Sequence, residues 1–129
     1  MGKDCWYVVD GYRPPLSKGG ADNYKGHECY MLLNCNEQDA HVLIDIFYKD
    51  KEPVLGIEYT VPAQRLASFY SEDAEVLGGV KLGIAEEYSI RFRSDVGIVV
   101  QYGRMDINCL LYTSRRHDCR YSKGELCRG

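Results

Sequence analysis

Eleven consecutive residues say most about how this chain folds: Val96-Gly97-Ile98-Val99-Val100-Gln101-Tyr102-Gly103-Arg104-Met105-Asp106. The uninterrupted Ile-Val-Val run is typical of a β-strand that is covered on both faces. Polar side chains follow it, and we expect Gln101, Arg104 and Asp106 to gather where the strand leaves the core. A buried strand with polar groups at its end is a rigid support for a binding site. An ordinary core strand with a solvated end has the same pattern.

Other short segments of β type lie along the chain, separated by turn residues. They are Cys5–Asp10, His27–Asn34, Ala40–Tyr48, Ile57–Val61, Gln64–Tyr70, Glu87–Arg93 and Asn108–Thr113. The segment from Gln64 also has helical spacing, but the nearby Pro62 favours a strand, and we expect a loop over Ser71–Ala85. Together these segments predict an all-β fold, a small antiparallel β-sandwich of about seven to nine strands.

Several of these strands are apolar on both faces. A sandwich of this size has one core, so the second apolar faces need another cover. A cyclic assembly of identical copies supplies it, and the 11 tyrosines suit surfaces that are partly buried against a partner. We therefore expect a homo-oligomer.

Charge divides the chain unevenly. The net charge is −3, yet the segment from Thr113 onward holds five basic residues against two acidic ones, +3, which leaves −6 elsewhere. We expect one β-sandwich domain over residues 1–113 and a basic, Cys-containing tail over 114–129. Nucleic-acid binding through the tail is one hypothesis. Its candidate residues are Arg115, Arg116, Arg120 and Lys123.

The six cysteines raise the question of compartment. The first residues lack the apolar centre of an export signal, and no apolar run approaches the roughly 20 residues that cross a bilayer. We therefore expect a cytoplasmic protein with free thiols and without direct membrane insertion. His117, Cys119 and Cys127 match no standard zinc spacing, so no metal site is predicted.

Five short motifs, in order, resemble those of the sensory rhodopsin transducer family. They are Cys5-Trp6 with Gly11-Tyr12-Arg13-Pro14-Pro15, His27-Glu28, Asp39-Ala40-His41-Val42 with Asp50-Lys51-Glu52-Pro53-Val54, Thr60-Val61-Pro62-Ala63-Gln64-Arg65, and Val99-Val100-Gln101 with Arg104 and Asp106. The resemblance runs from about Cys5 to Asp106. The chain departs from the family pattern in three places: Gly97 stands where the family usually has proline, Tyr102-Gly103 replaces His-Thr, and the tail after Thr113 is more basic and richer in Cys than expected.

The resemblance implies a small β-sandwich that assembles as a cyclic tetramer and takes part in signalling. It also implies a membrane photoreceptor as a partner and a small molecule, a sugar or sugar acid, as a ligand. It implies neither enzymatic activity nor a cofactor.

The residues themselves favour binding over catalysis. His27 and Glu28 are adjacent, so in a strand they point to opposite faces and cannot easily share a catalytic site. His41 lies in an apolar strand, where a core histidine is expected. Aromatic faces suit sugar rings, while carboxylates accept and arginines donate hydrogen bonds. The ligand-binding candidates are Trp6, Tyr12, His27, Glu28, Arg65, Gln101, Arg104 and Asp106. Each of these residues could instead serve only the fold, by packing in the core, forming an ion pair or capping a turn.

Overall fold

The computed structural model describes residues 2–14 and 26–105. All regular structure in this part is β, which confirms the predicted fold class. The strands are β1 (Lys3–Tyr12), β2 (His27–Asn34), β3 (Ala40–Tyr48), β4 (Val54–Val61), β5 (Arg65–Tyr70) and β6 (Glu87–Met105). Within the described residues no helix is long and apolar enough to cross a membrane.

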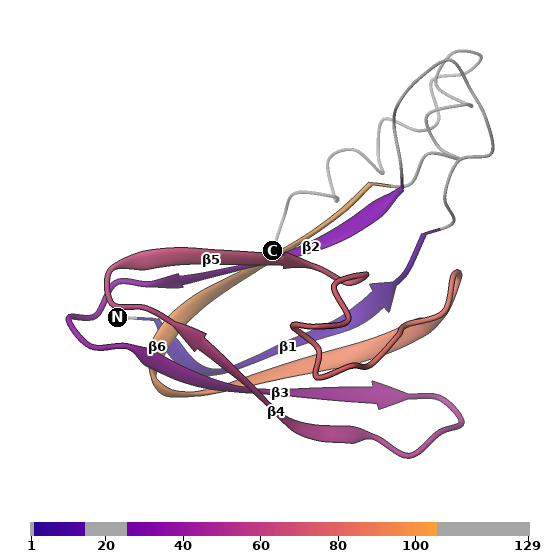
Figure 1. The fold of residues 1–129 in the computed structure, drawn as a ribbon, viewed down its shortest axis with the longest axis horizontal. Helices are drawn as coiled ribbons and strands as arrows, with labels where there is room; N and C mark the ends of the chain where they lie inside the picture. Colours follow the sequence, from indigo (N-terminus) through magenta and orange to yellow (C-terminus); the bar gives the residue numbers. More distant parts are fainter. Residues whose placement is uncertain (1, 15–25, 106–129) are drawn as a thin grey trace, which may run out of the picture.

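The long strand β6 belongs to both layers of the fold. Its first half pairs antiparallel with β1 and β3, and β4 continues that layer beyond β3. Its second half pairs antiparallel with β2, which in turn pairs with β5. Figure 1 shows the result, with β2 and β5 lying above β1, β3 and β4 while β6 runs through both groups. The sheet therefore curls over on itself and encloses one core.

Alternating side chains of both layers fill this core, as a period of two along each strand requires. Ile44 and Phe92 come from the lower layer and Tyr30, Leu32 and Phe69 from the upper one, and all are at most 2% exposed. The Tyr30 ring lies 5.3 Å from the Phe69 ring and 5.6 Å from the Phe92 ring, measured between centroids. These aromatic contacts join the two layers.

Strand β6 differs from the prediction because it does not break at Asp95. The sequence indicated two strands here, but β6 is paired with neighbouring strands on both sides of Asp95. Before it, Ser94 lies opposite Val42 of β3, and after it, Ile98 lies opposite Lys3 of β1. The strand bends instead of ending. Two predicted strands thus form one, and the predicted strand over Asn108–Thr113 lies outside the described residues.

The segment 71–85 forms turns, as predicted, yet it is also part of the core. Leu77 and Leu82 are each 1% exposed and pack with the strand residues. Backbone hydrogen bonds within the segment, such as Val80 N–H to Leu77 O at 3.1 Å, hold its turns. The segment therefore closes one open side of the sandwich.

Candidate functional site

Three of the predicted binding residues meet where β1 ends, β2 begins and β6 ends. Glu28 is paired in register with Arg104, and its Oε2 accepts the backbone N–H of Tyr12 at 2.8 Å. The Arg104 guanidinium lies 5.5 Å from the centre of the Tyr12 ring, and its Nη2 is 3.8 Å from Oδ2 of Asp10. The strands thus bring together residues that are far apart in the sequence.

The Glu28 carboxylate is the centre of this cluster and has no exposed surface. Tyr88 Oη donates to its Oε1 at 2.8 Å, and Tyr102 Oη donates to its Oε2 at 2.6 Å. The Tyr30 and Tyr88 hydroxyls are also bonded, at 2.8 Å. We call Glu28, Tyr30, Tyr88 and Tyr102 the tyrosine cluster. A buried carboxylate needs donors of this kind, because an unpaired buried charge is very unfavourable.

The tyrosine cluster depends on a close approach of β1 to β6. A Cβ atom at Gly11 would lie 2.7 Å from the Tyr88 carbonyl oxygen and 2.8 Å from its ring, so only glycine fits there. Burial, followed by the neighbouring Tyr30 phenol and the Glu28 charge, raises the pKa of Tyr88. Burial and the Glu28 bond likewise raise the pKa of Tyr102. The hydroxyls stay protonated as donors, and the Glu28 carboxylate uses both of its oxygens within the protein.

The other predicted candidates are not in this cluster. The His27 ring packs edge-on against Tyr70 at 5.6 Å, whereas the Glu28 carboxylate is turned to the interior. The Trp6 indole N–H donates to the Ile98 carbonyl oxygen at 2.9 Å, and its ring packs on the core. Arg65 donates to the carbonyl oxygen of its neighbour Gln64 at 2.9 Å. Trp6 and Arg65 therefore use their N–H donors for hydrogen bonds to the backbone of the protein itself.

Gln101, Arg104 and Asp106 were expected to gather at the end of one strand. This prediction is wrong for Gln101 and Arg104, because their side chains lie on opposite faces of β6. Gln101 shares the exposed face of β6 with Val99, which is 39% exposed, while Arg104 shares the other face with the buried Val100. The period of two along a strand separates them. Asp106 lies outside the described residues, as do Arg115, Arg116, Arg120 and Lys123.

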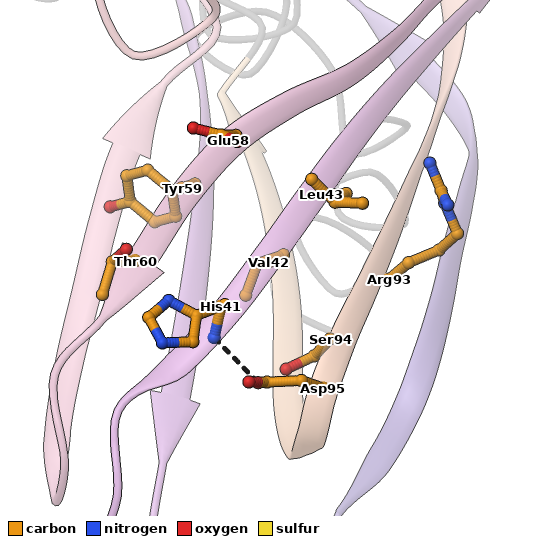
Figure 2. A pocket seen from close by; sticks show the side chains of 9 residues that line it. All are labelled: His41, Val42, Leu43, Glu58, Tyr59, Thr60, Arg93, Ser94 and Asp95. Atoms are coloured by element: carbon orange, nitrogen blue, oxygen red, sulfur yellow. Dashed lines mark hydrogen bonds between the residues drawn. The ribbon is translucent and has the colours of Figure 1, made fainter.

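A groove on the outer surface of β3, β4 and β6 is the best candidate for a binding site. Its volume is about 530 Å³, which falls in the range of small-molecule sites. Figure 2 shows its lining, with polar side chains on all three strands around the aliphatic Leu43. The lining residues are His41, Val42, Leu43, Glu58, Tyr59, Thr60, Arg93, Ser94 and Asp95.

Register explains why these residues meet. His41, Glu58, Thr60, Arg93 and Asp95 all point outward, and the pairing of β3 with β4 and β6 places their strands side by side. The Oδ1 atom of Asp95 accepts the His41 backbone N–H at 2.8 Å (Figure 2). His41 itself is exposed, so the prediction of a core histidine was wrong. Alternation along β3 is consistent with an outward-facing His41, but alternation does not show which strands lie beside β3.

One polar atom beneath the groove lacks a partner. The Oγ atom of Ser94 is buried, and among the described residues it has no hydrogen bond. Ser94 lies opposite the buried Val42 in the register of β6 with β3, so its hydroxyl faces the interior and is not presented to the groove.

Beside the groove, on the same face of β3 as His41 and Leu43, lies a second buried carboxylate, Asp45, which is fully covered. Arg93 donates to it twice, from Nε at 2.7 Å and from Nη2 at 2.8 Å, and Arg91 Nε donates at 2.7 Å. The Gly56 backbone N–H adds a bond of 2.8 Å. The Arg93 bond, opposed by burial and assisted by Arg91 and Gly56, holds the pKa of Asp45 well below its usual range.

The described residues contain no group of three or more His, Cys, Asp or Glu side chains arranged to hold a metal ion. In the same part of the chain, Cys5 and Cys35 are free thiols. The zinc spacing considered for His117, Cys119 and Cys127 lies outside the described residues.

Comparison with known proteins gives a consistent picture. The family model described as "Anabaena sensory rhodopsin transducer" matches residues 1–113. A solved structure named "Anabaena sensory rhodopsin transducer" is 36% identical, with a TM-score of 0.70, over 82% of this chain and 90% of that one. The crystal structure of Thermotoga maritima 1070 is 25% identical, with a TM-score of 0.67, over 81% of this chain and 82% of that one. A search of curated proteins gave no match.

Proposed function

The chain belongs to the Anabaena sensory rhodopsin transducer family, and from this premise we propose that it is a non-enzymatic transducer that binds a small polyhydroxylated molecule of the sugar type. In this proposal binding takes place in the groove of β3, β4 and β6. The transducer works as a homotetramer in signalling. A membrane photoreceptor is the partner that the family name suggests.

The observation that carries the ligand proposal is the groove itself, in which exposed polar side chains surround the aliphatic Leu43. Sugars need several donors and acceptors next to an apolar surface. Thr60 offers a hydroxyl, and Glu58 and Asp95 offer acceptors. The predicted candidates Tyr12, Glu28 and Arg104 support the fold in this proposal, because their hydrogen-bonding groups are used within the protein.

The proposal of a homotetramer is supported by an apolar surface on the other layer. Along the outer face of β5, β2 and β6, Leu66 and Val99 both lie opposite Leu33. Exposure of these three side chains ranges from 39% to 62%, and Met31 and Tyr70 extend the same face. A contiguous apolar face of this kind is typical of an interface. We call it the upper apolar face.

A thermal-shift screen of monosaccharides and their derivatives tests the ligand proposal. A ligand at 100 times its dissociation constant adds about 2.7 kcal/mol to the free energy of unfolding, so a binder raises the melting temperature clearly. The Thr60→Trp variant fills the groove and is expected to abolish the shift. Its control, Glu52→Trp in the exposed β3–β4 turn, is expected to keep it. A shift that survives Thr60→Trp would place the ligand elsewhere.

A further inference from the structure

We infer that the groove selects ligands by charge, and that it prefers a sugar bearing a protonated amine to a sugar acid. This inference rests on the proposed function, because it concerns the same groove. The family resemblance does not distinguish sugars from sugar acids, whereas the arrangement of charged groups around the groove does.

Two carboxylates of the lining are available to a ligand. Glu58 is exposed on β4, and among the described residues it has no hydrogen bond or ion pair. Asp95 uses Oδ1 to accept the His41 backbone N–H, which leaves its Oδ2 atom open. In Figure 2 both carboxylates lie among the lining residues, on strands on either side of β3. Each oxygen is an acceptor suited to an ammonium group.

Among the described residues, the lining has one arginine or lysine side chain, and it is already committed. Arg93 makes two bonds to Asp45, a geometry in which a guanidinium is strongly held by one carboxylate. Arg91 shares the same carboxylate but does not line the groove. Asp45, Glu58 and Asp95 outnumber Arg91 and Arg93, so these five side chains carry a net charge of −1.

The consequence for a ligand follows from Coulomb's law. An ammonium group in the groove is attracted by Glu58 and Asp95, while a carboxylate is repelled by both and finds no uncommitted guanidinium. Because the groove is open to solvent, each exposed pair changes affinity by up to about fivefold, and added salt weakens the effect. The exposed Thr60 hydroxyl can bond to ring hydroxyls of either ligand, so it contributes binding without charge selection.

Isothermal titration calorimetry with three sugars of one ring type tests the inference: glucosamine, glucose and glucuronate. At low salt we expect glucosamine to bind at least about fivefold more tightly than glucuronate, with glucose between them, and the difference to shrink as salt is added. Glu58→Gln and Asp95→Asn should each weaken glucosamine binding by a larger factor than glucose binding, because only glucosamine loses an ion pair. Asp50→Asn, in the exposed β3–β4 turn, is the control and should change neither.

The outcomes separate the two proposals. Glucuronate binding as tightly as glucosamine, or Glu58→Gln and Asp95→Asn affecting all three sugars equally, would overturn the charge inference and leave the groove as a sugar site. Absence of binding by all three sugars to the unmodified protein would overturn the inference together with the proposed sugar-binding function.

Discussion

Glu28 is a fully buried carboxylate, so its stability in the fold depends on its hydrogen-bond donors. It has no exposed surface, and it accepts two phenolic hydroxyls and one backbone N–H. Glu28→Ala leaves these donors buried without an acceptor, and each such group costs roughly 1–3 kcal/mol. We expect a loss of about 3 kcal/mol or more in the free energy of unfolding, measured by urea denaturation. Glu28→Gln, which keeps one acceptor oxygen, should lose less.

The matched control is Glu37→Ala, which removes an exposed carboxylate. Exposed substitutions of this kind change stability by about 0.5 kcal/mol or less. If Glu28→Ala proved no more harmful than this control, the tyrosine cluster would not stabilise the fold.

Asp45 gives a prediction about pH. Its folded pKa is lowered, chiefly by Arg93, so its stabilising effect is complete above the unfolded pKa of about 3.9 and is lost as the pH falls toward the folded pKa. Thermal unfolding from pH 6 downward should therefore show a steep loss of stability below about pH 4. In Asp45→Asn this slope should be shallower, and stability at pH 6 should be lower by about 1–3 kcal/mol. An unchanged slope would contradict this role.

At this scale the sequence did not predict the groove, because none of the predicted binding residues that the structure describes lines it. Tyr12, Glu28 and Arg104 do lie together, but around the buried Glu28 carboxylate and not in the groove. The roles were not predictable, because they depend on contacts between distant strands. Tyr102 illustrates this: in the sequence it looked like the loss of a family histidine, whereas in the fold it donates the 2.6 Å bond to Glu28.

Among the elements, the strands were the most predictable part of the chain. The bounds of β2 and β3 agree with the sequence pattern, because alternation of polar and apolar residues directly reports which face is buried. The continuity of β6 was not predictable, since Ser94, Asp95 and Gly97 are residue types typical of a turn. Pairing of β6 with β1 and β3 holds this stretch in one strand. The groove was missed for the same reason: its residues alternate correctly, but strand order decides which of them meet.

The 71–85 segment offers a prediction for an element that the sequence indicated only as a loop. Leu77 and Leu82 are 1% exposed, so Leu77→Ala and Leu82→Ala should each lower the free energy of unfolding by about 2–5 kcal/mol through lost burial and a cavity. Ile84→Ala, in the same segment but 55% exposed, is the control and should cost well under 1 kcal/mol. Equal, small effects in chemical denaturation would show that the segment is not part of the core.

For the whole molecule, we expect other copies of the chain to cover an apolar face that one copy leaves exposed, and this expectation can be tested. Within one chain the upper apolar face stays open, since Leu33, Leu66 and Val99 are each at least 39% exposed. If copies of the chain cover it, a buried charge there is very unfavourable, whereas the monomer tolerates the same charge in water. Leu66→Glu should therefore reduce a tetramer to smaller species in light scattering after gel filtration, with the circular dichroism of a folded β protein retained.

A charge on the other layer distinguishes assembly from general solubility. Leu55 is 57% exposed and lies on β4, outside the upper apolar face, so Leu55→Glu should leave the tetramer intact. If both variants stayed tetrameric, another surface would hold the copies together. If the unmodified chain were a monomer at working concentration, the apolar face would need a different partner. Because the groove lies on the opposite layer, assembly through the upper apolar face would leave it open on every copy.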